Sequence, residues 1–134
     1  MVKKMDKIKE LTVAFGFGGV FYGLIELLFR GHTHWSMLLT GGAVFCCLYF
    51  IFDIFYYENL LKNALLGAVI ITTAEFAVGC IVNIGLNMHV WDYSHKAMNL
   101  YGQICPAFSF GWFALSIAAF YISAAIRRNL RALT

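Results

Sequence analysis

The chain has 134 residues, of which 61% are hydrophobic and only 13% are charged. Soluble domains contain roughly 45–50% apolar and about 25% charged residues, so the composition excludes a soluble globular domain, a disordered tail and a conventional nucleic-acid-binding domain. The formal net charge of +3 does not indicate a nucleic-acid partner, because the basic residues lie where membrane topology requires them.

The apolar residues fall into four blocks, at residues 11–29, 35–57, 64–86 and 104–126. Each block has about 19–23 residues, enough for an α-helix to cross a hydrocarbon core of about 30 Å. The strict alternation of a membrane β-strand is not present. We therefore predict an all-α polytopic membrane protein: one four-helix transmembrane bundle, a single domain over residues 1–134.

The lysines and arginines predict the orientation of this bundle. Eight of the ten lie in the N-terminal arm, between the second and third blocks, and in the C-terminal tail. The other two, Arg30 and Lys96, lie in the two remaining loops. Because lysine and arginine concentrate on the cytoplasmic side of a membrane, we predict cytoplasmic termini in a multi-pass protein of the inner (cytoplasmic) membrane, with the lipid bilayer as its surroundings.

Glu75 is the first candidate for a functional residue, because it falls near the centre of the third block. A lone carboxylate is unfavourable there, so we expect it to face the other helices and to be protonated or paired with a cation. Thr72, Glu75, Gly79 and Asn83 recur at three- and four-residue intervals and form one stripe of a helix. The stripe suits a cavity for a cation, a proton or a small hydrogen-bonding solute, or else hydrogen bonds between helices.

Glu26 and Asp53 lie nearer the ends of their blocks. Glu26 precedes Arg30 by one helical turn, with the acidic residue first, which is the favourable order for an ion pair on a helix. This pairing and a role in a binding site are equally good interpretations of Glu26. Asp53 can lie in an apolar block because its side chain, near the end of the block, can reach the membrane interface.

The four histidines, His32, His34, His89 and His95, all fall in the predicted outer loops. Imidazole and carboxylate groups bind zinc, but neither His-x-His nor the spacing of His89, Asp92 and His95 is diagnostic. They are weak candidates for metal ligands, and we predict no cofactor. The sequence contains no P-loop, so the protein cannot itself bind ATP through that motif.

The connection at residues 87–103 is long and mixes aromatic with polar residues. It contains Trp91-Asp92-Tyr93-Ser94, preceded by the run from Glu75 to Gly79 and followed by Asn99, Gly102, Ile104 and Cys105. This pattern resembles the type IV ABC-transporter membrane family, whose small bacterial members carry similar E-x-x-x-G, W-D-Y-S and N-x-x-G-x-I-C segments. The resemblance covers roughly the second half of the chain.

The resemblance implies that acidic, aromatic and amide residues and one glycine gather at the outer mouth of the bundle: Glu75, Trp91, Asp92, Tyr93, Asn99 and Gly102. An intact helix would place Glu75 roughly 16 Å below residue 86. Contact with the loop therefore requires the third helix to end early, near Gly85, or the loop to dip between helices. We expect a funnel from Asp92 through Asn83 to Glu75; the alternative is a loop anchored at the interface, with Asp92 in water.

These observations predict a membrane component of a transport system for a small solute or cation, with an outward-facing polar cavity around Glu75 and the loop. Its small size suggests a homodimer, and Gly19 and Gly23 allow close helix approach within the bundle or across a dimer. The alternatives are an intramembrane or outer-face metal-dependent enzyme, and a scaffold or regulatory subunit of a membrane complex. The lack of a recognisable nucleophile–base pair favours a function other than catalysis.

Overall fold

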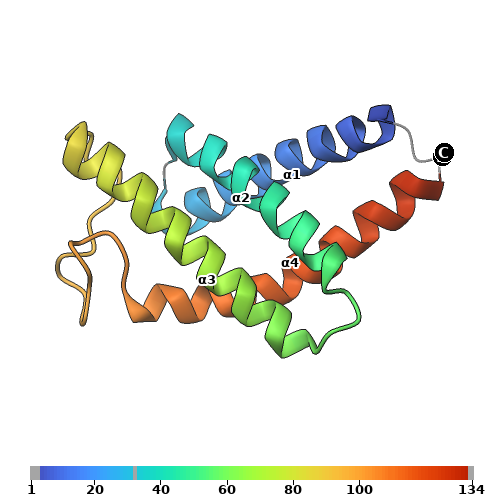
Figure 1. Ribbon diagram of the computed structural model, residues 1–134. Coiled ribbons are helices and arrows are strands. Elements are labelled where there is room, and N and C mark those ends of the chain that lie inside the picture. Colours follow the sequence, from blue (N-terminus) through green and yellow to red (C-terminus); the bar gives the residue numbers. More distant parts are fainter. Residues whose placement is uncertain (1–3, 32, 133–134) are drawn as a thin grey trace. The chain divides into compact units, whose positions relative to one another are not determined.

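The computed structural model describes residues 4–31 and 33–132, without the side chains of residues 4–6, 29 and 30. Four α-helices follow one another (Figure 1): α1 (Lys4–Arg30), α2 (Trp35–Ile54), α3 (Leu60–Gly79) and α4 (Pro106–Ala132). A π-helix, η1 (Cys80–Gly85), continues α3. The four helices are each long and apolar enough to cross a membrane, and the described residues form no β-strand. The predicted all-α polytopic fold is confirmed.

The observed helices do not begin and end at the same residues as the predicted apolar blocks. α3 begins before the predicted block because Asn59 caps it: Asn59 Oδ1 accepts a hydrogen bond of 2.7 Å from the backbone N–H of Leu61, which satisfies a free donor of the first turn. α4 continues beyond residue 126 to Ala132. The apolar blocks mark the lipid-compatible stretches, whereas the cap at Asn59 decides where α3 begins.

The chain divides into two compact units. Unit 1 is Met1–Tyr57 with Ala118–Thr134, and unit 2 is Glu58–Ile117. Unit 1 therefore contains α1, α2 and the second half of α4. Unit 2 contains α3, η1, the long loop and the first half of α4.

Close packing of α1 against α2 depends on glycines in unit 1. A Cβ atom at Gly18 would lie 2.7 Å from the carbonyl oxygen of Gly41, and one at Gly19 would lie 2.9 Å from that of Leu38. Gly23 faces the side chain of Leu38 in the same way. Small residues let two helix backbones approach each other, so the stripe that contains Gly19 and Gly23 packs within the chain.

The second half of α4 completes the core of unit 1. Ala14, Phe45 and Tyr49 are buried in this core, and partly buried apolar residues of α2 and α4 pack against them: Cys46, Ala119, Ile122 and Ile126. Residues of three helices thus form one apolar cluster, and this cluster buries one face of each helix in unit 1.

Unit 2 is distinguished by the end of α3 and by the loop that follows. In η1 the backbone N–H of Leu86 donates to the carbonyl oxygen of Ile81 (2.8 Å), five residues earlier, which is the π-helical pattern. The loop then folds back alongside the end of α3 (yellow to orange in Figure 1). Its strained positions are four non-glycine residues with φ between 53° and 56°: Asn87, His89, Met98 and Tyr101. Such residues persist only where surrounding contacts hold them.

Candidate functional site

Glu75 lies on α3 with its side chain buried, at 4% exposure. Its Oε1 accepts a hydrogen bond from Trp112 Nε1 on α4 (3.1 Å), and its Oε2 accepts one from the hydroxyl group of Tyr93 in the long loop (3.1 Å). Three segments of unit 2 therefore meet at one carboxylate. The prediction that Glu75 faces other parts of the protein is confirmed.

Aromatic rings adjoin one another beside this carboxylate. The rings of Tyr93 and Phe108 stack with centroids 4.7 Å apart and planes 10° apart. Phe108 lies 6.5 Å from Trp112, and Trp91 lies 6.5 Å from Tyr93. The ammonium group of Lys96 lies 5.6 Å from the centroid of the Phe108 ring. We call these four rings the aromatic cluster: Trp91, Tyr93, Phe108 and Trp112.

The loop is held in place by buried amide groups. Asn83 Oδ1 accepts hydrogen bonds from the backbone N–H groups of Val90 (2.6 Å) and Trp91 (3.3 Å), and Asn83 Nδ2 donates to Gln103 Oε1 (2.8 Å). Trp91 Nε1 donates to the carbonyl oxygen of Gln103 (3.0 Å). Asn83, predicted to line a cavity, therefore connects η1 to both ends of the loop.

Asn99 organises the turn at the far end of the loop. Its Nδ2 donates to the carbonyl oxygens of Ser94 (3.2 Å) and Lys96 (3.0 Å), and its Oδ1 accepts from the backbone N–H of Gly102 (2.8 Å). Gly102 has a φ of 70°, which glycine adopts without strain. These contacts tie Asn99 to the backbone of its own loop.

The funnel from Asp92 through Asn83 to Glu75 stays a prediction, and the structure places Asp92 at the surface of the loop. Asp92 is exposed, and its Oδ1 accepts a hydrogen bond from the backbone N–H of Ser94 (2.8 Å). This hydrogen bond lowers the pKa of Asp92 from its ordinary value of 3.8 because it stabilises the charged form. The loop does dip toward Glu75, but Tyr93, the next residue, makes the contact.

Polar residues of the α3 stripe also connect helices directly. Thr72 Oγ1 lies 3.0 Å from Ser109 Oγ on α4, within hydrogen-bond distance. An apolar groove of about 590 Å³ lies beside this pair, and Glu75 does not line it. Thr72 therefore matches the alternative interpretation of the stripe, hydrogen bonding between helices.

Glu26 is buried at 5% exposure on α1. It belongs to unit 1, whereas Glu75 belongs to unit 2. The expected pairing of Glu26 with Arg30 falls on a side chain outside the described residues.

The histidines have separate surroundings. His34 caps α2: its Nδ1 accepts a hydrogen bond from the backbone N–H of Ser36 (3.2 Å). His89 and His95 are exposed on the loop, and His32 lies outside the described residues. Within residues 4–31 and 33–132, no three His, Cys, Asp or Glu side chains are arranged to hold a metal ion.

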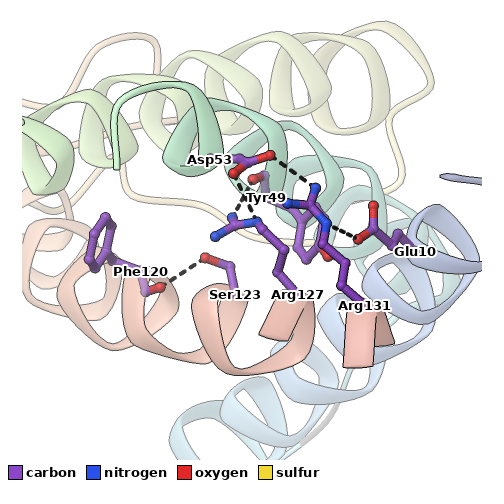
Figure 2. Close-up of polar contacts among 7 residues, drawn as sticks. All are labelled: Glu10, Tyr49, Asp53, Phe120, Ser123, Arg127 and Arg131. Carbon is purple, nitrogen blue, oxygen red and sulfur yellow. Dashed lines mark hydrogen bonds and ion pairs between the residues drawn. The ribbon is translucent and has the colours of Figure 1, made fainter. Parts of the chain in front are cut away.

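Unit 1 contains an ionic cluster that we did not predict from the sequence (Figure 2). Arg131 Nε lies 3.0 Å from Glu10 Oε1, and Arg131 Nη2 lies 3.2 Å from Asp53 Oδ2. Arg127 Nε lies 3.2 Å from Asp53 Oδ1, and Arg127 Nη2 donates to the carbonyl oxygen of Tyr49 (3.1 Å). The two guanidinium groups extend from α4 toward α2 and α1, so the cluster connects all three helices of unit 1.

The search for apolar blocks did not reveal this cluster, because some of its charged residues lie outside the blocks. Glu10 precedes the first block and Arg127 follows the last one, so both count as chain ends in a hydropathy analysis. One signal in the sequence could have revealed it. Glu10 lies before the first block, Asp53 lies near the end of the second, and the oppositely charged Arg127 and Arg131 follow the last block, one turn apart on one helix face. Asp53, which we explained by contact with the interface, is in fact shared by these two arginines.

Residues 10–134 match the protein family described as "Putative ABC-transporter type IV". The chain belongs to this family. The family match extends well beyond the second half of the chain and includes Glu75, the long loop and the ionic cluster. With its four apolar helices, this member of the ABC-transporter type IV family is a multi-pass membrane protein of a transporter type. No match was found among curated proteins or among solved structures.

Proposed function

We propose that this protein is the membrane component of a transport system for a small solute or cation, and that Glu75 binds the transported species. The observation that supports this is a buried carboxylate in an apolar helix whose oxygens accept hydrogen bonds from two neutral donors, Tyr93 and Trp112. Ionisable groups inside a membrane-spanning helix are unfavourable and mark substrate or ion pathways. These two hydrogen bonds hold the carboxylate in a fixed position between the loop and α4.

The long loop provides the route to this site. Tyr93 is the loop residue that touches Glu75, so movement of Tyr93 opens the carboxylate toward the side of the membrane that the loop faces. The excess of lysine and arginine at the termini and near Lys62 supports cytoplasmic termini and an outer loop. The site then faces outward.

Cysteine labelling tests this topology. In a background without the four native cysteines, Lys96→Cys should react with a membrane-impermeant maleimide on intact cells. Lys62→Cys should react only after the membrane is permeabilised. The reverse result would place the loop in the cytoplasm and remove the argument for an outward-facing site.

The energy source in this proposal is a separate ATPase subunit. The family is of the ABC-transporter type, and the sequence has no P-loop of its own. We propose that the protein acts in the inner membrane as a homodimer with this subunit. Affinity purification of the tagged protein from its native membranes should recover an ATPase in stoichiometric amount; recovery of the protein as a monomer without one would contradict the assembly.

Ligand-dependent melting tests the role of Glu75. The purified protein is heated with a panel of solutes and salts, and a ligand at 100 times its Kd should stabilise it by about 2.7 kcal/mol. Glu75→Gln should abolish that stabilisation. Glu58→Gln is the matched control, because Glu58 is an exposed loop carboxylate paired with Lys62. A ligand that stabilises wild type and Glu75→Gln equally would refute the proposed site.

A further inference from the structure

We propose that one end of unit 1, formed by the start of α1 and the end of α4, binds the headgroups of anionic phospholipids. This inference goes beyond the proposed function and does not depend on Glu75, which belongs to unit 2. Three features support it: an excess of exposed basic side chains at this end, their depth relative to the apolar blocks, and the apolar and tyrosine side chains exposed beside them.

The ionic cluster brings the two segments together. The contact between Glu10 and Arg131 joins the first two turns of α1 to the last turn of α4 (Figure 2). Asp53, near the end of α2, contacts the same arginine. Within the cluster two carboxylates face two guanidinium groups, so their charges balance. The acidic groups of the cluster therefore do not offset the charge of the basic residues around it.

The basic residues around the cluster are in excess. Lys7 and Lys9 on α1 and Arg128 on α4 are exposed. None of the three forms an ion pair with a side chain that the structure describes. The side chains of the charged residues before Lys7 lie outside the described ones. Three exposed positive charges at one end of a membrane protein are complementary to the phosphate groups of anionic lipids.

The depth of these residues matches that of lipid phosphates. The first apolar block begins at residue 11 and the last one ends at residue 126. Lys9 and Arg128 therefore lie about 3 Å along the helix beyond the hydrocarbon core, and Lys7 lies about 6 Å beyond it. The headgroup layer on each side of the core is about 5–8 Å thick. The three residues thus fall in the layer that contains the phosphate groups.

Exposed apolar and tyrosine side chains at this end favour lipid over an acidic protein as the partner. Ile8, between the two lysines, is 60% exposed, so an apolar side chain accompanies the charges. Tyr57 follows Asp53 of the ionic cluster by four residues and is 98% exposed. Tyrosine is enriched at the membrane interface, where its apolar ring and polar hydroxyl group are both accommodated. Such a surface contacts headgroups and the upper parts of acyl chains together.

The test uses the full-length protein in a neutral detergent and follows its melting temperature as phosphatidylglycerol is added. Phosphatidylcholine with the same acyl chains is the uncharged comparison lipid, and glycerol phosphate is the headgroup without chains. We expect a saturable rise that is larger with phosphatidylglycerol than with phosphatidylcholine and absent with glycerol phosphate. Raising the salt from about 0.1 M to about 1 M shortens the Debye length from about 10 Å to about 3 Å and should remove the preference. This salt dependence tests the proposal without any substitution.

Charge-removing variants locate the site. Lys9→Gln and Arg128→Gln should each weaken phosphatidylglycerol binding by about fivefold, the contribution of one basic residue beside an anionic membrane surface. Both side chains are exposed, so melting without lipid should match that of the wild type. Arg128→Lys keeps the charge and should bind as the wild type does. Lys96→Gln is the matched control, because it removes one positive charge from the long loop of unit 2, and it should leave the affinity unchanged.

Several outcomes would overturn the inference. They are equal responses to the two lipids, a preference that persists at high salt, stabilisation by glycerol phosphate alone, and an equal loss of affinity in Lys96→Gln. If Lys9→Gln and Arg128→Gln bind phosphatidylglycerol as the wild type does but no longer recover an ATPase from native membranes, the surface docks a protein instead. None of these results affects the proposed role of Glu75, which is tested separately by ligand-dependent melting of Glu75→Gln.

Discussion

Gly79→Ala should destabilise the attachment of the long loop to α3. A Cβ atom at Gly79 would lie 2.5 Å from Gln103 Oε1 and 2.9 Å from Trp91 Cζ2. Gln103 is only 4% exposed, and its Oε1 accepts the hydrogen bond from Asn83 Nδ2. The glutamine side chain therefore cannot move away without losing that bond, and the indole ring of Trp91 is rigid. The loop itself has to shift.

The contributions to this effect have opposite signs. Alanine is favoured over glycine inside a helix by about 0.8–1.0 kcal/mol. Overpacking a buried contact costs about 1–3 kcal/mol, and loss of the hydrogen bond between Asn83 and Gln103 costs about 0.5–1.5 kcal/mol more. The net effect on the free energy of unfolding of unit 2 is a destabilisation of about 0.5–4 kcal/mol.

Thermal unfolding in detergent, followed by circular dichroism, measures this change. Limited proteolysis of residues 86–105 shows whether the loop detaches first. Gly111→Ala is the matched control in the same unit. Apart from the backbone of its own helix and its chain neighbours, no atom lies within 4 Å of the Cβ position at Gly111, so alanine should stabilise the protein by up to about 1 kcal/mol. If Gly79→Ala is as stable and as protease-resistant as Gly111→Ala, the loop does not pack on α3 as described.

Two further predictions concern charged groups. Arg131→Met should lower stability in detergent melting by about 2–3 kcal/mol, because it leaves the Glu10 carboxylate buried without its guanidinium partner; Arg131 itself is half-exposed, which limits the loss. Lys62→Met should change stability by less than about 0.5 kcal/mol, since its ion pair is exposed, and an equal effect of both would contradict the account of the cluster. The hydrogen bond from Ser94 lowers the pKa of Asp92 below 3.8, so its contribution to loop stability is complete above the ordinary carboxyl pKa and is lost as the pH falls through the lowered pKa. Melting between about pH 6 and pH 2.5 should show this loss in wild type and not in Asp92→Asn; parallel curves would show that the hydrogen bond does not matter.

The membrane residence, the four helices and the inward orientation of Glu75 were predictable from the sequence. These properties depend on local features: the length of each apolar block, and the energetic penalty for a carboxylate at the centre of one. The family was recognisable from its short motifs for the same reason, because a motif is a local pattern. Helix ends were less predictable, since Asn59 lies outside the third apolar block and still starts α3.

The partners of the buried charges were decided only by the tertiary structure. Tyr93 and Trp112 are separated from Glu75 by 18 and 37 residues, and Arg131 is separated from Glu10 by 121 residues. No periodicity within one helix relates such positions; they meet because of how the loop folds and how the helices pack. The fold of the loop also gives the neighbours Asp92 and Tyr93 different surroundings. Asp92 accepts a hydrogen bond from Ser94 in its own turn at the surface, whereas Tyr93 donates one to the buried carboxylate of Glu75.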